Sequence, residues 1–206
     1  MIVGTFKSNV ILESCKEEEI MRKNLGAKPF LYPQVVMIIA SYDENGTPDA
    51  MNAAWGGVSG GNQLFICLSP DHKTVKNILN KKAFTVSVAD EAHVVESDYV
   101  GIVSASKVPD KLAHAGLHTT KSEFVDAPVI DEFPLALECK LLSYDPETHY
   151  MFGEIVNVAA DESILDENGV IDAGKLKPIV FDMAASAYWS LGEKVGKAFS
   201  DGSKLK

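Results

Sequence analysis

The most informative hydrophobic pattern of the chain lies between residues 34 and 57. An apolar run from Val35 to Ala40 is followed by the polar sequence Asp43-Glu44-Asn45-Gly46, and then by a second strand-like segment. The dipeptide Asn-Gly favours the positive φ angles that tight hairpin turns need. The pattern therefore predicts a β-hairpin whose first strand covers residues 34–41.

The returning strand of this hairpin is unusual because its side chains are small. In residues 51–57 (MNAAWGG) Trp55 is the main exception, whereas strands usually carry bulky or β-branched side chains. Alanine and glycine leave backbone N–H and C=O groups accessible to a flat or large ligand. Two interpretations remain open, which are a close-packed barrel strand with a bulge and a platform for a ligand.

The rest of the pattern indicates short strands with a few short helices. Residues 83–88 (AFTVSV) alternate with the period of a strand, and residues 75–79 carry apolar positions at helical spacing. Many short strands with few helices are typical of a β-barrel with helical decoration, and no GxGxxG motif indicates a Rossmann site. We expect one domain over residues 1–206. Further strands are expected at 1–15, 64–68, 135–143, 150–159 and 179–181, and helices at 17–25, 71–82, 90–98 and 110–115.

Composition narrows the classes of partner. The net charge of −10 argues against nucleic acids and anionic membranes as main partners, so a phosphate-bearing ligand would need a local basic pocket. No apolar run reaches the roughly 20 residues of a membrane span, and the first residues lack the features of a signal peptide. The three cysteines, Cys15, Cys67 and Cys139, are widely spaced, which favours buried thiols and a cytoplasmic location.

The segment from Ser69 to Thr74 is the strongest ligand signal after the small-residue strand. It opens a predicted helix with Asp71 as its N-cap, and a helix N-terminus offers unpaired N–H groups and partial positive charge to a phosphate. His72 and Lys73 add cationic groups at the same end. An ordinary capped helix with solvated side chains is the alternative interpretation.

The sequence gives little indication of a metal site or of nucleophilic catalysis. His114 and His118 have the i, i+4 spacing of a helical metal site, but Gly116 interrupts the helix and no third ligand lies nearby, so surface histidines are favoured and no metal is expected. Ser104 and Ser106 lack the glycine elbow of a hydrolase. No catalytic residue is assigned. If the protein is an enzyme, a cofactor carries the difficult chemistry.

Taken together, these motifs resemble the flavin reductase-like family, which has the FMN-binding split β-barrel fold, and they are closest to its flavoredoxin branch. The resemblance covers roughly residues 30–160. It rests on the order of five segments, which are 35–56, Asp71-His72-Lys73-Thr74, Phe84 to Val88, the segment 98–111 with Ser104 and Ser106, and His149 ahead of Tyr150-Met151-Phe152-Gly153-Glu154.

The resemblance implies a mainly β homodimer that binds FMN near the subunit interface. The flavin ring would lie against the backbone of Met51, Asn52, Ala53, Ala54 and Trp55, with residues 188–189 covering the site. The phosphate would be held by His72, Lys73 and Thr74. The remaining expected contacts are Ser69, Ser87, Tyr99, Lys111 and His149.

The implied activity is that of an oxidoreductase, passing electrons from NADH, NADPH or a redox protein through FMN to an acceptor. Two features depart from the family pattern. His72-Lys73 stands where many relatives have an arginine, so the bidentate fork is lost, and the platform has Ala53 and Ala54 but no cysteine. The alternatives are a non-catalytic protein that stores flavin or holds haem on the same barrel, and a structural barrel dimer without a cofactor.

Overall fold

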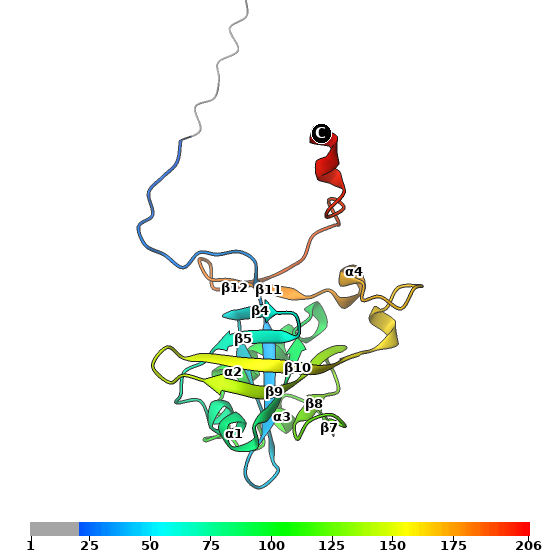
Figure 1. Cartoon of the computed structure of the whole chain (residues 1–206). Coiled ribbons are helices and arrows are strands. Elements are labelled where there is room, and N and C mark those ends of the chain that lie inside the picture. The colour runs from blue at the N-terminus through cyan, green and yellow to red at the C-terminus, as the bar shows by residue number, and fades with distance from the viewer. Residues whose placement is uncertain (1–20) are drawn as a thin grey trace, which may run out of the picture.

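The computed structural model describes residues 21–206, and its centre is an antiparallel sheet of seven strands in the order β3-β2-β6-β9-β10-β5-β4 (Figure 1). The chain is mainly β with short helices. The strands of this sheet are β2 (Met37–Tyr42), β3 (Pro48–Ala53), β4 (Gly56–Gly60), β5 (Gln63–Cys67), β6 (Ala83–Val88), β9 (Leu135–Tyr144) and β10 (Tyr150–Ala160).

The sheet is curled into a half-barrel, and its two edge strands are neighbours in sequence. β3 and β4 lie at opposite edges of the sheet, yet only Ala54 and Trp55 separate them in the chain. At Gly56 a Cβ atom would lie 2.6 Å from the carbonyl oxygen of Phe65 and 2.7 Å from the Cε of Met37 on β2. Glycine at this position therefore allows β4 to lie close to β5 and to Met37 of β2.

The predicted hairpin is confirmed. β2 pairs with β3 from Met37 opposite Ala53 to Tyr42 opposite Pro48. Gly46 has a φ of +82°, whereas Asn45 is not among the residues with positive φ, so only the glycine takes the left-handed conformation. The connection from Asp43 to Thr47 is therefore longer than two residues, and Gly46 takes the left-handed conformation near its end. It is not a two-residue turn, in which both residues would have positive φ.

The two faces of the sheet are buried against different layers. Phe84 and Val86 of β6 point into the barrel core with Ile39 and Ile66, as the alternating pattern predicts. Thr85, on the opposite face of β6, is also fully buried, and its hydroxyl donates to the carbonyl of Pro128 at 2.6 Å. A short hairpin of β7 (Thr119–Lys121) and β8 (Pro128–Ile130), which the pattern did not predict, covers that face.

The two longest helices pack against the hairpin strands β2 and β3. α1 (Lys73–Lys81) links β5 to β6 and packs on β2, while α2 (Val94–Ile102) packs on β3. α1 agrees with the helix predicted at 71–82, whereas the helix predicted at 90–98 matches the 3-10 turn at 91–93 and only the first half of α2. The remaining helical segments are η1 (Glu91–His93), α3 (Lys111–His114), η2 (Glu162–Ile164), α4 (Ala173–Leu176) and η3 (Asp201–Leu205).

A second, three-stranded sheet joins residues 34–35 to residues 179–190. It consists of β1 (Gln34–Val35), β11 (Ile179–Asp182) and β12 (Ala187–Ser190) in the order β1-β11-β12. The strand expected over 34–41 is therefore divided between two sheets. At the break, the N–H of Val36 donates to the carbonyl of Ile179 at 3.4 Å. The pattern predicted β11 but neither β4 nor β12.

Several expectations concern residues that the structure does not place or places differently. The strand over 1–15, Cys15 and most of the helix over 17–25 lie outside the described residues, and residues 21–25 are not helical.

Cys139 is buried, and this burial, with a smaller effect of Glu138, raises the thiol pKa to about 12. Cys67 is only half-buried. Within residues 21–206, no helix has the length and apolarity needed to cross a bilayer.

Candidate functional site

A cleft of about 300 Å³ lies between β3, the start of α1 and the end of α2. Three separate parts of the chain meet there, because α1 and α2 each pack on the hairpin strands. Its volume is at the lower end of the range found for ligand pockets. The lining residues are Asp49, Met51, Asn52, His72, Lys73, Thr74, residues 100–105 and Lys111.

The N-terminus of α1 opens into this cleft. The helix begins at Lys73, and His72 is the N-cap residue but makes no side-chain capping hydrogen bond. Asp71 was expected to cap the helix, and this was wrong because it lies one residue too early and is exposed to solvent. The first turn also carries no acidic residue. Its N–H groups and the positive end of the helix dipole are therefore left for an anion.

Lys73 adds a partly exposed positive charge beside this helix end. Its side chain is 24% exposed, and its Nζ lies 3.4 Å from the Oδ2 of Asp43 in the hairpin turn. The Asp43 carboxylate also accepts hydrogen bonds from the N–H groups of Asn45 and Thr47, both at 2.9 Å. Partial burial opposes ionisation of Asp43, but these two N–H groups and Lys73 together lower its pKa below the usual value.

A buried ion pair forms the base of the cleft. Asp49 of β3 and Lys111 of α3 are 1% and 3% exposed, and Lys111 Nζ lies 3.1 Å from Asp49 Oδ1. The other carboxylate oxygen, Oδ2, accepts from the hydroxyl of Thr74 at 2.7 Å and from the amide of Asn77 at 3.4 Å. This one carboxylate thus connects β3, α1 and α3.

Lys111 also holds the C-terminal end of α2. Its ammonium group donates to the carbonyl of Val100 at 3.3 Å and to that of Val103 at 3.0 Å. Asp49 Oδ1 lies 3.1 Å from the same ammonium as its ion-pair partner but accepts no hydrogen bond within residues 21–206, so two of the three N–H donors are used. The side chain therefore positions the cleft wall, and its burial beside Asp49 keeps it directed into the protein.

The wall that α2 forms is also fixed to β3 through Asn52. Its amide donates to the carbonyl of Ser97 at 2.9 Å and lies 3.5 Å from the hydroxyl of Tyr188, which donates to Asp98 at 2.8 Å. Burial, followed by the bond to Asp98, raises the pKa of Tyr188 to about 12. A Cβ atom on Gly101 would lie 2.9 Å from the Cβ of Asn52, so this glycine lets α2 approach β3 closely.

The structure brings together six of the thirteen residues that were expected to contact a cofactor. Met51, Asn52, His72, Lys73, Thr74 and Lys111 line the cleft. Ala53, Ala54 and Trp55 continue from β3 towards β4, outside the lining, and Trp55 is half-exposed.

The other four expected residues lie at the edge of the cleft or away from it. Ser69 precedes α1 and its carbonyl accepts from the N–H of His72 at 3.3 Å, while the carbonyl of His149 accepts from Leu68 at 2.8 Å. Ser87 is fully buried on β6, two strands from β3. Tyr99 packs against the apolar cluster beneath α2.

Three residues of the site were missed from the sequence. Asp49, Asp98 and Gly101 were not among the expected contacts, although the segment 98–101 supported the family resemblance. Asp49 lies just before the predicted strand 51–57 and within the observed β3, and a charged residue in the returning arm of a hairpin is itself a signal, because buried carboxylates are nearly always paired. His114 and His118, the rejected metal pair, instead lie 3.4 Å and 2.7 Å from the carboxylates of Asp110 and Glu132. Within residues 21–206, no group of three or more His, Cys, Asp or Glu side chains could hold a metal ion.

Comparison with known proteins agrees with this architecture. The family model described as the flavin reductase like domain matches residues 30–181. The chain belongs to the flavin reductase-like family. A flavoredoxin of Desulfovibrio vulgaris (Miyazaki F) has 37% sequence identity and a TM-score of 0.85 to this chain, and the match covers 88% of this chain and all of that one.

A more distant solved structure supports the fold, and a curated relative matches only part of the flavin reductase-like chain. An FMN-binding domain of a flavin reductase-like enzyme from Shewanella baltica OS155 has a TM-score of 0.71 at 19% identity, covering 80% of this chain and 89% of that one. An uncharacterized protein of Aquifex aeolicus (strain VF5) is 36% identical over 108 residues, which is 52% of this chain and 55% of that protein. The chain thus spans about half the length of the curated relatives that it matches.

Proposed function

We propose that this chain binds FMN in the cleft between β3, α1 and α2 and acts as a flavin oxidoreductase. The observation that carries the proposal is the open N-terminus of α1, which faces the cleft with no capping side chain and with Lys73 beside it. A phosphate monoester fits such a site because it accepts several N–H bonds and is doubly charged near neutral pH. The fold and the family support flavin as the group that carries this phosphate.

The residues around the cleft fit the rest of the cofactor. The phosphate would bind the N–H groups of the first turn of α1 and the ammonium of Lys73, while Thr74 stays engaged with Asp49. The flavin ring would extend along the backbone of residues 51–55, where Ala53 and Ala54 have no bulky side chain to block it. The half-exposed ring of Trp55 would shield one edge of the flavin from water.

Bound FMN would supply the redox chemistry, accepting a hydride or electrons and passing them to an acceptor. The protein would hold the ring, exclude water and leave one face open for NADH, NADPH or a protein donor. At about 300 Å³ the cleft of one chain is small for a dinucleotide and a flavin together, so we propose that a homodimer completes the site.

An absorption titration tests this proposal. The purified chain is titrated with FMN and then, without oxygen, with NADH and NADPH. We expect flavin bands that shift on binding and bleach with a nicotinamide. Bands that bleach only with a reduced redox protein would indicate an electron carrier, and bands that no donor bleaches would indicate a storage protein. Failure to bind FMN would overturn the proposal.

A matched pair of variants tests the phosphate contact. Lys73→Ala should weaken FMN binding by about 1.5–3 kcal/mol, which is roughly 10- to 150-fold, because a charge-assisted bond is lost. Lys76→Ala removes the same charge from the exposed face of the same helix and should leave FMN affinity within about twofold. Equal affinities of the two variants would place the phosphate elsewhere.

A further inference from the structure

The side-chain amide of Asn52 is held in one orientation by the wall of the cleft. Its nitrogen Nδ2 donates to the backbone carbonyl of Ser97 at 2.9 Å. A carbonyl oxygen only accepts hydrogen bonds, so the amide presents its nitrogen to Ser97 and turns its oxygen, Oδ1, away from this carbonyl.

Tyr188 of β12 and Asp98 of α2 fix the second N–H of the same amide. The hydroxyl of Tyr188 donates to Asp98 at 2.8 Å, and its oxygen lies 3.5 Å from the nitrogen of Asn52. Because the single hydrogen of the hydroxyl is used on Asp98, the oxygen is left to accept from Asn52. The raised pKa of Tyr188, about 12, keeps that hydrogen in place at neutral pH. Both N–H groups of the amide are thus engaged within the protein.

The oxygen of Asn52 remains as an acceptor in the cleft. Within residues 21–206 no group donates to it, yet it is not among the buried side-chain atoms without a partner, which are Asp49 Oδ1, Ser87 Oγ and Ser97 Oγ. The oxygen is therefore accessible, and Asn52 lines the cleft. An acceptor whose amide cannot turn selects a ligand group that carries an N–H or O–H.

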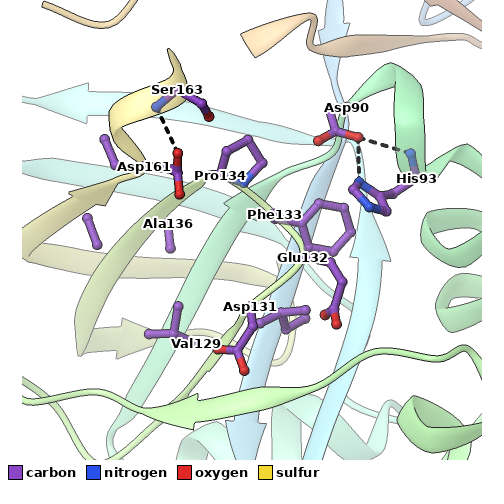
Figure 2. Close-up of a pocket in the computed structure, with 13 residues that line it drawn as sticks. Asp90, His93, Val129, Asp131, Glu132, Phe133, Pro134, Ala136, Asp161 and Ser163 are labelled. Atoms are coloured by element: carbon purple, nitrogen blue, oxygen red, sulfur yellow. Dashed lines mark hydrogen bonds and ion pairs between the residues drawn. The ribbon is translucent and has the colours of Figure 1, made fainter. Parts of the chain in front are cut away.

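A larger groove, of about 520 Å³ over the start of β9 and the end of β10, differs from the cleft in this respect (Figure 2). The carboxylate of Asp90 lies 2.8 Å from the ring nitrogen Nδ1 of His93 and accepts from the N–H of the same residue at 3.0 Å. Asp161 accepts from the N–H of Ser163 at 2.8 Å. These carboxylates bond to their own neighbours, whereas the cleft presents an acceptor that is both oriented and unused.

We propose that Tyr188 and Asp98 are positioning residues that hold the Asn52 oxygen ready for a hydroxyl of the ribityl chain of FMN. The ribityl chain joins the phosphate to the flavin ring. Asn52 lines the same cleft as the start of α1, where the phosphate would bind, and precedes Ala53 and Ala54, along which the ring would lie. The proposal rests on the proposed function and adds to it a selection for the hydroxylated chain.

Two flavins that differ only in this chain test the contact. The purified protein, freed of flavin, is titrated with FMN and with an analogue in which an unsubstituted pentyl chain joins the same ring to the same phosphate. The quenching of flavin fluorescence gives both affinities. We expect FMN to bind about tenfold more tightly, because the analogue leaves the Asn52 oxygen without a donor. Equal affinities would overturn this proposal and leave the proposed function intact, whereas failure to bind either flavin would overturn both.

Variants of the amide and of its holder test the positioning. Asn52→Ala keeps the Cβ that lies beside Gly101 but removes the amide, and it should abolish the preference for FMN. Tyr188→Phe keeps the ring next to Phe181 and frees one N–H of Asn52, so the preference should fall about threefold while the affinity for the pentyl analogue stays within about twofold. Tyr42→Phe is the control, because it removes a hydroxyl from β2 outside the cleft lining and should keep the full preference.

Asp98→Ala completes the set. It frees the hydrogen of the Tyr188 hydroxyl, so it should lower the preference for FMN to the same extent as Tyr188→Phe. Thermal unfolding of each variant establishes that it is folded. A full preference in Tyr188→Phe or in Asn52→Ala would overturn the proposal. An equal loss of affinity for both flavins in Tyr188→Phe would overturn it as well, since Tyr188 would then support only the fold.

Discussion

Two lysines border the same cleft, and their surroundings give them different roles. Lys111 is 3% exposed, forms an ion pair with a carboxylate that is also buried, and donates to two backbone carbonyls. Lys73 is 24% exposed and has one partner at 3.4 Å. Charge alone therefore does not identify a ligand-binding residue. The number of unused donors and the access to solvent decide which lysine can take an anion.

The energetics of the two pairs differ for the same reason. A buried pair has lost its hydration, so removing one partner leaves an uncompensated charge at high cost. The side chains of Lys73 and Asp43 are 24% and 12% exposed, so this pair keeps partial contact with water and its lysine can exchange Asp43 for a ligand at a smaller cost. Lys111 is thus expected to affect folding, and Lys73 to affect binding.

The largest effect is expected for Lys111→Met, which leaves Asp49 buried without its cation. We expect a loss of about 3–5 kcal/mol in the free energy of unfolding, measured with urea. Adding Asp49→Asn should recover part of the loss, because the uncompensated charge is removed. If Lys111→Met alone weakened FMN binding at unchanged stability, Lys111 would be a ligand contact and the contrast between the two lysines would fail.

Gly101→Ala tests the wall that Lys111 holds. The added Cβ would lie 2.9 Å from the Cβ of Asn52, so α2 must move away from β3. We expect a loss of about 1–3 kcal/mol in the free energy of unfolding, together with weaker FMN binding. Gly61→Ala is the control, because a Cβ there meets nothing within 4 Å. Equal stability of the two variants would show that the close approach is unnecessary.

Lys73→Ala should change the free energy of unfolding by less than about 1 kcal/mol, because its pair with Asp43 keeps partial contact with water. The same variant should lose most of its FMN affinity, as proposed above. Urea unfolding of the cofactor-free protein separates the two effects. A large loss of stability without FMN would mean that Lys73 is structural, like Lys111.

The smallest expected effect is on stability at acid pH. The pKa of Asp43 is lowered by the Thr47 and Asn45 N–H groups and by Lys73, against the opposing effect of burial. Its contribution to stability is therefore present above the unfolded pKa of about 4 and is lost as the pH falls through the folded value. Asp43→Asn should flatten this part of the acid unfolding curve and raise FMN affinity a few-fold at pH 7 by releasing Lys73. An unchanged curve would argue against this role of Asp43.

Features that depend on neighbouring residues were predictable from the sequence. The hairpin at Gly46, the helix α1 and the alternation in β6 were correct because turn chemistry and apolar periodicity act over a few residues. The predicted helix N-terminus with His72 and Lys73 already indicated a phosphate site at the α1 segment, the family resemblance implied the same role, and this role stays a prediction. The local pattern predicted the wrong N-cap for α1, Asp71 instead of His72, because the exact start of a helix depends on how it packs.

The tertiary structure alone decided which residues face the cleft. Asp49 and Lys111 are distant in sequence, and nothing in the local pattern indicates that they meet, since their pairing follows from the packing of α3 and β3. The same holds for β3 and β4, which are neighbours in sequence but opposite edges of the sheet, and for β12, whose Tyr188 reaches Asn52. Sequence determined the elements because short-range sterics and burial fix them. The fold determined the site because long-range packing decides which charges are buried, which are saturated and which stay free.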